Sequence, residues 1–337
     1  MTGTGFSLCT FADPAGVHQP GLVIGDRAWA IAELAQRAVG GLQALHGRSV
    51  LDLLGTWSQS FDALQELAEG IASSGLEGTP LAELSLCAPV DLPRQIFCTG
   101  ANYRKHVVDL TVDMGVGPEG LDEAGLREWA TKMMEQRARE GEPYAFTKPV
   151  SAIAGPNDSL IVPPTTKQLD WEIELGVVIG RAGYNIALAD AMDHVAGYAI
   201  VNDISARDLI ARTDYKMLGT DWLRAKGQPG FLPFGPVLMP AKFVPEPENL
   251  AMRLSVGGQI MQDESTADML FGIARQIEYI SRYARLLPGD LICTGSPAGN
   301  GTHYNRYLQP GDVMIAEIEG LGRQTVHCIA PGMSDHG

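Results

Sequence analysis

Alternate acidic residues mark one short stretch of the chain, residues 170–180, which reads DWEIELGVVIG. A β-strand turns successive side chains to opposite faces, so Asp170, Glu172 and Glu174 would share one face. The apolar residues that follow predict a buried strand, and burying unpaired carboxylates costs several kcal/mol or forces them to take up protons. A hard divalent cation such as Mg²⁺ or Ca²⁺ would remove that cost, because it prefers oxygen ligands. The alternative is the exposed polar face of an edge strand, since the E-x-E pattern is common.

A further carboxylate, Asp203, strengthens the prediction of a metal site. It ends a second apolar run, in AGYAIVNDISARD, where a side chain can be presented to a cleft. With no cysteine cluster nearby, carboxylates favour a hard cation over zinc. Arg207, in the same segment, could clamp a substrate carboxylate with two hydrogen bonds, or form a structural ion pair with Asp208 or another acid.

The chain from residue 94 onward, which must position these residues, is predicted to form mainly β-strands. Short apolar runs recur there, and glycine, proline and aspartate punctuate them. This pattern favours an all-β barrel-like or sandwich core with a few added helices. The amphipathic stretch 268–287 predicts a helix that stops at Pro288-Gly289.

Two segments differ from this strand pattern. Residues 1–90 combine strands expected around 21–31 with helical periodicity at 53–71, which predicts a small first domain of mixed structure. The segment 103–145 is polar and predicts two helices, the second at about 121–140, separated by a Gly/Pro break. Long insertions between core elements are often functional, so we favour a lid over a site, with a surface excursion as the alternative.

Composition narrows the function classes. The formal net charge of −15 would repel a polyanion, so nucleic acid is not an expected partner. No apolar run approaches the roughly 20 residues needed to cross a bilayer, and the N-terminus does not resemble a secretory signal, so we expect a cytoplasmic protein without a membrane partner. The five cysteines are scattered without a C-x-x-C pair, which argues against disulfides or a zinc site.

Seven motifs, in order along the chain, resemble the fumarylacetoacetate hydrolase family. They are FCTGANYRKHVVD, FTKPVSAIAGPND, DWEIELGVVIG with VNDISARD, AKGQPGFLPFGPVL, GGQIMQDESTADMLF, LLPGDLICTGSPAGNG and YLQPGDVMIAEIEGLG. The resemblance implies a mixed, mainly β fold: a β-sandwich roll catalytic domain with flanking helices at 94–330, after a small α+β domain at 1–90. It also implies a homodimer.

The same resemblance assigns roles to individual residues. It implies Mg²⁺ or Mn²⁺ as the cofactor, with Ca²⁺ as a possible substitute, held by Glu172, Glu174 and Asp203. It implies that His106 is the catalytic histidine on the lid, with Asp109 as its acidic partner. The remaining residues that it places at the substrate are Lys226, which would polarise it, and Arg207, Thr294, Tyr103, Lys148 and Ser151, which would bind it.

These roles imply hydrolysis of a 2,4-dioxo acid such as an acylpyruvate. The metal would bind the 2-oxo acid end, His106 would activate water, and the C–C bond would break to release pyruvate, or a related 2-oxo acid, and a carboxylic acid. The metal would stabilise the enolate that leaves. Asp109 is shorter than the glutamate of many members, so a decarboxylase or an isomerase or hydratase of a 2-oxo acid remains an alternative. A non-catalytic metal-binding protein is a third interpretation.

Overall fold

The structure of the protein is a computed structural model that describes residues 4–37, 45 and 48–333. Parts of the predicted first domain, residues 1–3, 38–44 and 46–47, therefore lie outside the described residues. None of the described helices is both long and apolar enough to span a membrane.

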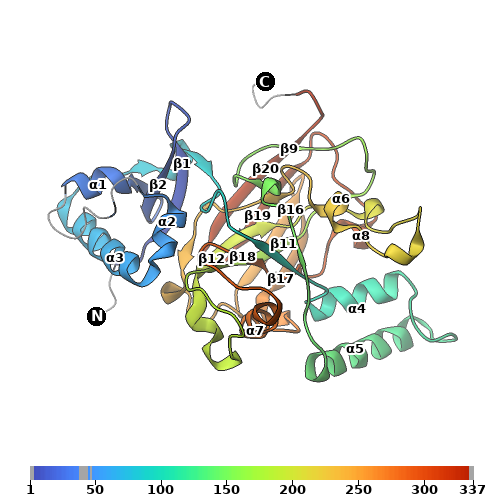
Figure 1. Cartoon of the computed structure of the whole chain (residues 1–337). Helices are drawn as coiled ribbons and strands as arrows, with labels where there is room; N and C mark the ends of the chain where they lie inside the picture. The colour runs from blue at the N-terminus through green and yellow to red at the C-terminus, as the bar shows by residue number, and fades with distance from the viewer. Residues whose placement is uncertain (1–3, 38–44, 46–47, 334–337) are drawn as a thin grey trace.

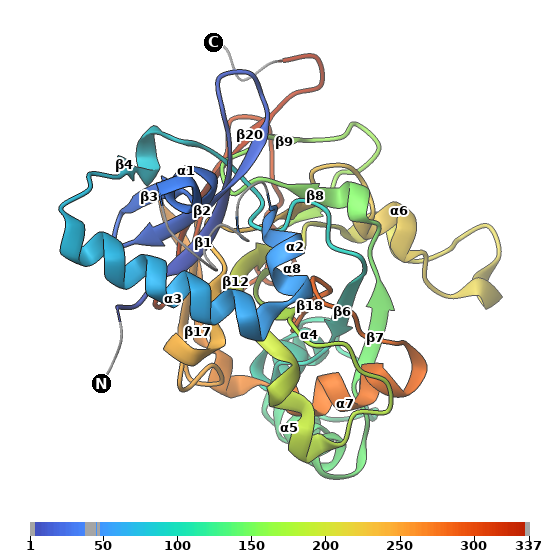
Figure 2. The same cartoon turned by 60° about the vertical axis from the view of Figure 1, so that its left-hand side comes forward.

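The first part of the chain forms a sheet covered by helices (Figure 1). Figure 2 brings α3 forward and shows it lying across the strands. Helix α3 buries Phe61, Leu64, Ala68 and Ile71, whose three- and four-residue spacing explains the helical periodicity of the sequence. The strands, in spatial order, are β4 (Thr79–Pro80), β3 (Arg27–Ala30), β2 (His18–Ile24), β1 (Ser7–Ala12) and β5 (Ser85–Cys87), and the helices are α1 (Ile31–Arg37), α2 (Val50–Gly55) and α3 (Trp57–Ser74).

A second sheet carries the acidic stretch. Its strands, in spatial order, are β15 (Met239–Pro240), β12 (Val195–Asn202), β11 (Ile173–Ile179), β18 (Leu291–Cys293), β6 (Ile96–Gly100) and β7 (Tyr144–Thr147). Strand β11 lies between β12 and β18, and every one of its residues is buried. The interpretation of this stretch as an exposed edge strand is therefore wrong, because both edges of β11 are hydrogen-bonded to neighbours.

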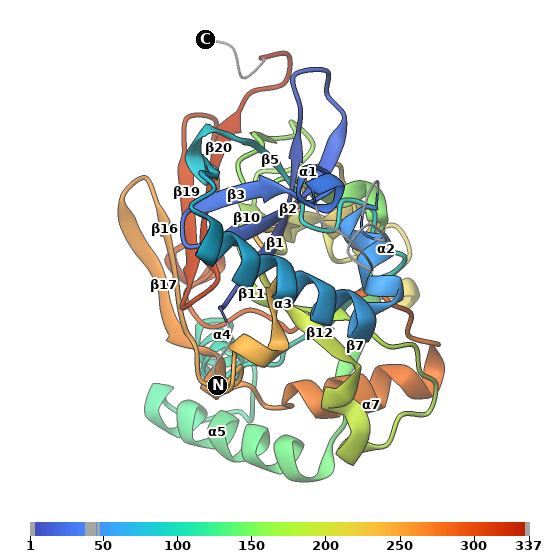
Figure 3. The same cartoon turned by 90° about the vertical axis from the view of Figure 1, so that its left-hand side faces the viewer.

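A third sheet packs beside the second, and Figure 3 shows β17, β16, β19 and β20 in a row. Its strands, in spatial order, are β17 (Gln259–Ser265), β16 (Ala251–Val256), β19 (Val313–Ile318), β20 (Gly322–Ile329) and β9 (Leu160–Ile161). Two short pairs complete the strands: β10 (Leu169–Asp170) with β13 (Ser205–Ala206), and β14 (Leu232–Pro233) with β8 (Ile153–Ala154). The fold is thus mixed and rich in sheet, as the sequence predicted.

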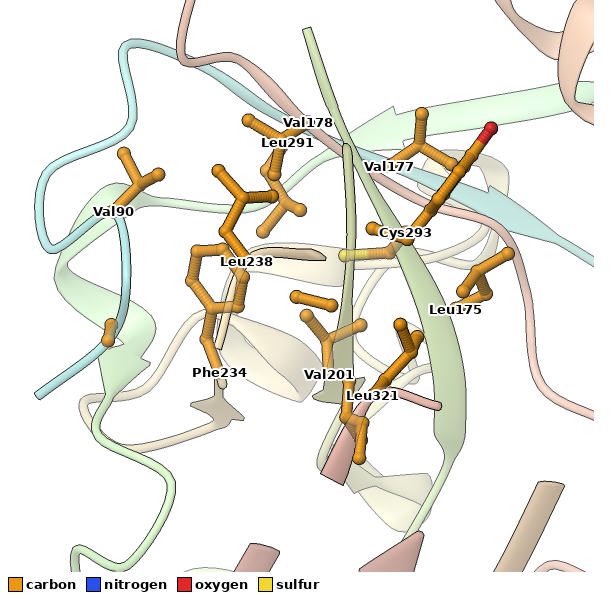
Figure 4. Close-up of a cluster of buried hydrophobic side chains, with 14 of the residues drawn as sticks. Val90, Leu175, Val177, Val178, Val201, Phe234, Leu238, Leu291, Cys293 and Leu321 are labelled. Carbon is orange, nitrogen blue, oxygen red and sulfur yellow. The ribbon is translucent and has the colours of Figure 1, made fainter. Parts of the chain in front are cut away.

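One apolar core joins these sheets. Figure 4 shows part of it, where Val178 of β11 and Leu291 of β18 lie on one side of the sheet, and Leu175 and Val177 of β11 lie on the other. Leu8 of the first sheet exchanges two backbone hydrogen bonds with Leu238, at 2.9 and 2.7 Å, so the first part of the chain is bonded directly to the rest. The division into domains at about residue 90 stays a prediction.

The helix predicted at 268–287 is shorter in the structure than the sequence indicated. The stretch 268–287 forms α7 (Ile273–Tyr283), which ends before the predicted stop at Pro288-Gly289. The prediction was wrong there because Ala284 is extended and Leu286 pairs with Gly183 through two backbone hydrogen bonds. Pairing with another segment outweighed the helical periodicity.

The polar insertion forms a helical hairpin, α4 (Arg104–Asp113) and α5 (Glu123–Glu140), which confirms its two predicted helices. The two helices lie side by side at one end of the molecule, on the side away from α1–α3 (Figure 1). Val108 of α4 and Ala130 and Met134 of α5 form a small apolar cluster with Leu270 and Phe271, which anchors the hairpin to the body of the protein.

Candidate active site

Three carboxylates converge where β11 and β12 meet. These strands are antiparallel with Ile173 opposite Asn202, so Glu172, which precedes β11, lies beside Asp203, which follows β12. Glu174 is the second residue of β11, and oxygen atoms of all three side chains lie within 4.8 Å of one another. All three residues are buried, so their mutual repulsion must be offset by nearby positive charge.

Two buried lysines supply part of that charge. Lys226 ends α6 (Trp222–Lys226), and its Nζ donates to Glu172 Oε2 and to Asp203 Oδ2, each at 2.5 Å. Burial opposes the charged form of Lys226, but Asp203 and Glu172 outweigh it and raise the pKa of this amine. Lys148, which follows β7, donates from Nζ to the other oxygen of Asp203 at 2.5 Å.

Glu174 remains the least compensated of the three carboxylates. Its Oε2 accepts a hydrogen bond of 2.8 Å from the backbone N–H of Gly295, and it belongs to no ion pair found among the described residues. Burial, followed by the charges of Asp203 and Glu172, raises the pKa of Glu174 well above its usual value. Three oxygen donors with excess negative charge fit a hard divalent cation such as Mg²⁺ or Mn²⁺, and Ca²⁺ has the same preference for oxygen.

Arg207 and Asp170 brace this cluster from one side. Arg207 donates from Nε to Asp170 Oδ2 at 2.8 Å and from Nη2 to Glu172 Oε1 at 2.6 Å. Burial raises the pKa of Asp170 despite the opposing charge of Arg207. Asp208 instead accepts a hydrogen bond from Thr166. The sequence offered two structural ion pairs for Arg207, one with Asp208 and one with another acid, and the structure forms the second. Arg207 thus fixes the position of Glu172.

Replacing Arg207 with methionine is expected to lower the free energy of unfolding by about 3–5 kcal/mol, because Asp170 would be left buried without its cation. The matched control is Arg253→Met, which breaks an exposed pair with Asp263 and should change stability by less than about 1 kcal/mol. Urea unfolding followed by circular dichroism measures both. Equal losses in the two variants would contradict a bracing role for the buried pair.

A cavity of about 310 Å³ opens onto the carboxylates, and His106 lines it with Arg207 and Lys226. His106 lies on α4, and Leu110 and Met114, at four-residue spacing, line the same cavity. Loss of solvent around the imidazole, with the nearby charges of Arg207 and Lys226, lowers the pKa of His106 to about 4, although Glu172 opposes this. The ring is therefore neutral at pH 7 and able to accept a proton.

Comparison with known proteins places this arrangement in a family. Residues 95–328 match the family described as fumarylacetoacetate (FAA) hydrolase C-terminal. The chain belongs to the fumarylacetoacetate hydrolase family. It is 33% identical over 294 residues to the bovine mitochondrial protein named oxaloacetate tautomerase FAHD2A, with 84% of each chain covered.

Two solved members of the fumarylacetoacetate hydrolase family share the fold. The enzyme of Exiguobacterium antarcticum superposes with a TM-score of 0.71 at 27% identity, over 96% of this chain and 99% of the other. Fumarylpyruvate hydrolase of Pseudomonas aeruginosa, solved with Mn²⁺ and pyruvate, gives a TM-score of 0.56 at 30% identity, over 71% and 90%. Family members of this kind act on acylpyruvates or other oxo acids and include hydrolases and tautomerases.

Asp109, the expected partner of the family's histidine, points elsewhere in this structure. Its carboxylate accepts a hydrogen bond of 2.6 Å from Arg127 of α5. It lines a separate hollow together with Lys105 and Glu264, whereas His106 lines the cavity at the carboxylates. The two side chains leave α4 in different directions, and their pairing as a catalytic dyad stays a prediction.

Four predicted substrate contacts lie outside the cavity lining. One is Lys148, which is bonded to Asp203 as described above, and its contact with substrate remains a prediction. Tyr103 is fully buried, and its hydroxyl donates to the sulfur of Met252 at 3.5 Å. Thr294 is also buried and donates from Oγ1 to the backbone oxygen of Leu175 at 2.9 Å. Ser151 is exposed in the turn that precedes β8. Tyr103 and Thr294 therefore support the walls of the site, and substrate contact by these three residues remains a prediction.

The sequence reasoning missed an aromatic wall. Phe146 of β7 stacks on Trp222 of α6, with ring centroids 4.7 Å apart and planes 17° apart. Trp222 donates from Nε1 to the hydroxyl of Tyr144 at 2.8 Å, which fixes its ring. Both Phe146 and Trp222 line the cavity. Trp222 lies one helical turn before Lys226, a spacing that could have revealed it.

The long insertion also supports the cavity wall at Ala101. This residue lines the cavity and has φ of +52°, a left-handed conformation that is unusual outside glycine. Its backbone oxygen accepts a hydrogen bond of 2.5 Å from Nη1 of Arg137 in α5, whose guanidinium lies over the ring of Phe271. The second helix of the insertion thus contacts the site through Arg137 as well as through packing on α4.

Proposed function

We propose that this protein is a divalent-metal-dependent hydrolase that cleaves the C–C bond of a 2,4-dioxo acid, giving pyruvate or a related 2-oxo acid and a carboxylic acid. The observation that carries the proposal is His106, a neutral imidazole that lines the same cavity as three converging carboxylates. The fumarylpyruvate hydrolase solved with Mn²⁺ and pyruvate supports it.

A cation held by Glu172, Glu174 and Asp203 would supply Lewis acidity at the 2-oxo group of the substrate. His106 takes a proton from water as the water oxygen forms a bond to the C4 carbonyl carbon. The C3–C4 bond then breaks, the acyl part leaves as the carboxylic acid, and the electron pair stays on the pyruvate part as its enolate. His106 returns the proton to C3, so the atoms balance as substrate plus one water. Lys226 holds positive charge beside the developing anion.

A second candidate is an oxo-acid tautomerase, and one observation favours it. Asp109 accepts a hydrogen bond from Arg127, and no hydrogen bond between Asp109 and His106 is found among the described residues. A lone neutral imidazole suffices to move a proton between C3 and the carbonyl oxygen of a 2-oxo acid. The name of the bovine relative, oxaloacetate tautomerase, agrees with this alternative.

Ultraviolet loss of an acylpyruvate panel, with products identified, distinguishes the two. The proposal expects stoichiometric pyruvate and carboxylic acid in the presence of Mg²⁺ or Mn²⁺ and none with EDTA. Enol-to-keto conversion of oxaloacetate without cleavage of any acylpyruvate would replace the hydrolase with the tautomerase. Release of carbon dioxide from oxaloacetate would instead indicate the decarboxylase.

The cytoplasmic location, the homodimer and the choice between Mg²⁺ and Mn²⁺ remain proposals from the family resemblance. The bovine relative is named as mitochondrial. The location of this chain therefore needs a test of its own. Sedimentation of the purified protein checks the homodimer, and rates with each metal rank the two cations.

A further inference from the structure

The wall of the cavity changes character away from the carboxylates. Leu110, Met114 and Val116 line it from α4 and the segment that follows, and Phe146 with Trp222 lines it from β7 and α6. Met114 lies two turns along α4 from His106, so this lining extends roughly 12 Å from the histidine. Met114 and Val116 are exposed, which places them at the open mouth of the cavity.

The positive charges in the cavity lining are already engaged. Arg207 and Lys226 are the two arginine or lysine side chains among the described residues that line it. Arg207 is bonded to Asp170 and Glu172, and Lys226 to Glu172 and Asp203. A second carboxylate on a substrate would meet no free cation at this wall, and an unpaired carboxylate is costly to remove from water.

The hydroxyl groups of the lining are engaged as well. Thr111 donates from Oγ1 to the backbone oxygen of Val107 at 2.7 Å, and Thr99 donates to Gln276 at 2.8 Å. Ser296 accepts a hydrogen bond of 3.0 Å from Gln262. The part of the cavity beyond the carboxylates therefore offers mainly apolar contact.

We propose that the acyl group of the substrate is uncharged and apolar, so that this protein prefers an alkanoyl- or aroylpyruvate to a dicarboxylic substrate. This inference rests on the proposed function for the identity of the reacting end. Oxaloacetate and fumarylpyruvate, in the names of two relatives, both carry a second carboxylate. The aromatic wall would contact a flat or extended apolar group, and its preference would follow from desolvation.

Binding of N-substituted oxamates, which resemble the pyruvate end and are not cleaved, tests the inference without catalysis. Titration calorimetry with the Mn²⁺-loaded protein would compare N-hexyl oxamate with N-(2-carboxyethyl) oxamate. We expect the hexyl compound to bind at least about tenfold more tightly, since each buried methylene contributes several-fold. Equal or tighter binding of the carboxylate compound would overturn the inference.

An added charge should reverse the preference. Val116→Arg places a free cation at the mouth of the cavity, at an exposed position where folding should be unaffected. The ratio of the two affinities should shift at least about tenfold toward the carboxylate compound. The matched control is Leu121→Arg, an exposed apolar residue of the same insertion outside the lining, which should leave the ratio unchanged. Equal shifts in both variants would contradict the assignment.

The outcomes separate this inference from the proposed function. If the hexyl compound binds more tightly but no acylpyruvate is cleaved, the proposed hydrolysis fails and the apolar preference stands. If acylpyruvates are cleaved but the dicarboxylic ones fastest, hydrolysis stands and the preference is wrong. If neither oxamate binds with Mn²⁺ present, both are wrong.

Discussion

Glu174→Gln is expected to abolish tight binding of a divalent cation and to lower kcat/KM on the order of 10³-fold. The substitution keeps the shape of the side chain but removes one of three negative charges that a hard cation requires. Glu174 is the informative choice because Glu172 and Asp203 are bonded to buried lysines, which their replacement would leave unpaired. Calorimetric titration with Mn²⁺ and rates at saturating metal measure the two effects.

The stability of the same variant gives a second, independent check. Burial and the neighbouring carboxylates raise the pKa of Glu174, so its ionised form costs free energy in the metal-free protein. The neutral amide removes that cost, and the metal-free variant should unfold at an equal or higher urea concentration. The matched control is Glu317→Gln on β19, a half-buried glutamate outside the cavity lining, which should alter neither metal binding nor rate. Full activity of Glu174→Gln would refute the metal site.

His106→Ala is expected to lower kcat for acylpyruvate cleavage by about 10²–10⁴-fold with Mn²⁺ affinity unchanged. General-base catalysis by a placed imidazole contributes an effect of this size, and His106 is not one of the three carboxylates that would hold the metal. The pKa of His106 is lowered to about 4, so it stays unprotonated well below pH 6. Protonation of His106 should therefore cause no fall in the wild-type rate as the pH is lowered from 8 to about 5.

Added imidazole should partly restore the rate of His106→Ala, because the deletion leaves room beside the cavity. His303→Ala is the matched control, since His303 is bonded to Asp113 outside the cavity lining and its removal should leave cleavage within about threefold. Tautomerisation of oxaloacetate should be measured on the same variants. Cleavage by His106→Ala at the wild-type rate would mean that water is activated without this histidine.

The cluster of carboxylates could be predicted from the sequence because alternation and burial are local properties. The run from Glu172 to Ile179 is apolar apart from its acids, so its place inside a sheet follows from burial. Asp203 could be added because it ends a second apolar strand, and antiparallel pairing brings that end to Glu172. The seven motifs then supplied the fold of the catalytic region, which periodicity alone had described only as barrel-like or a sandwich.

The hydrogen-bond and ion-pair partners of individual side chains could not be predicted from the sequence. Asp109 pairs with Arg127, and Arg207 with Asp170, through contacts between segments whose relative placement no spacing rule gives. The end of α7 was misplaced for the same reason, because residues after Tyr283 pair with Gly183. The stack of Phe146 on Trp222 joins a strand to a helix far along the chain, so the apolar wall appeared only with the structure.

A crystal structure of the protein soaked with Mn²⁺ and pyruvate tests the central claim most directly. The account predicts one anomalous scattering peak between Glu172, Glu174 and Asp203, with pyruvate beside it and His106 facing the bound molecule. A site without a peak at saturating Mn²⁺ would contradict the account.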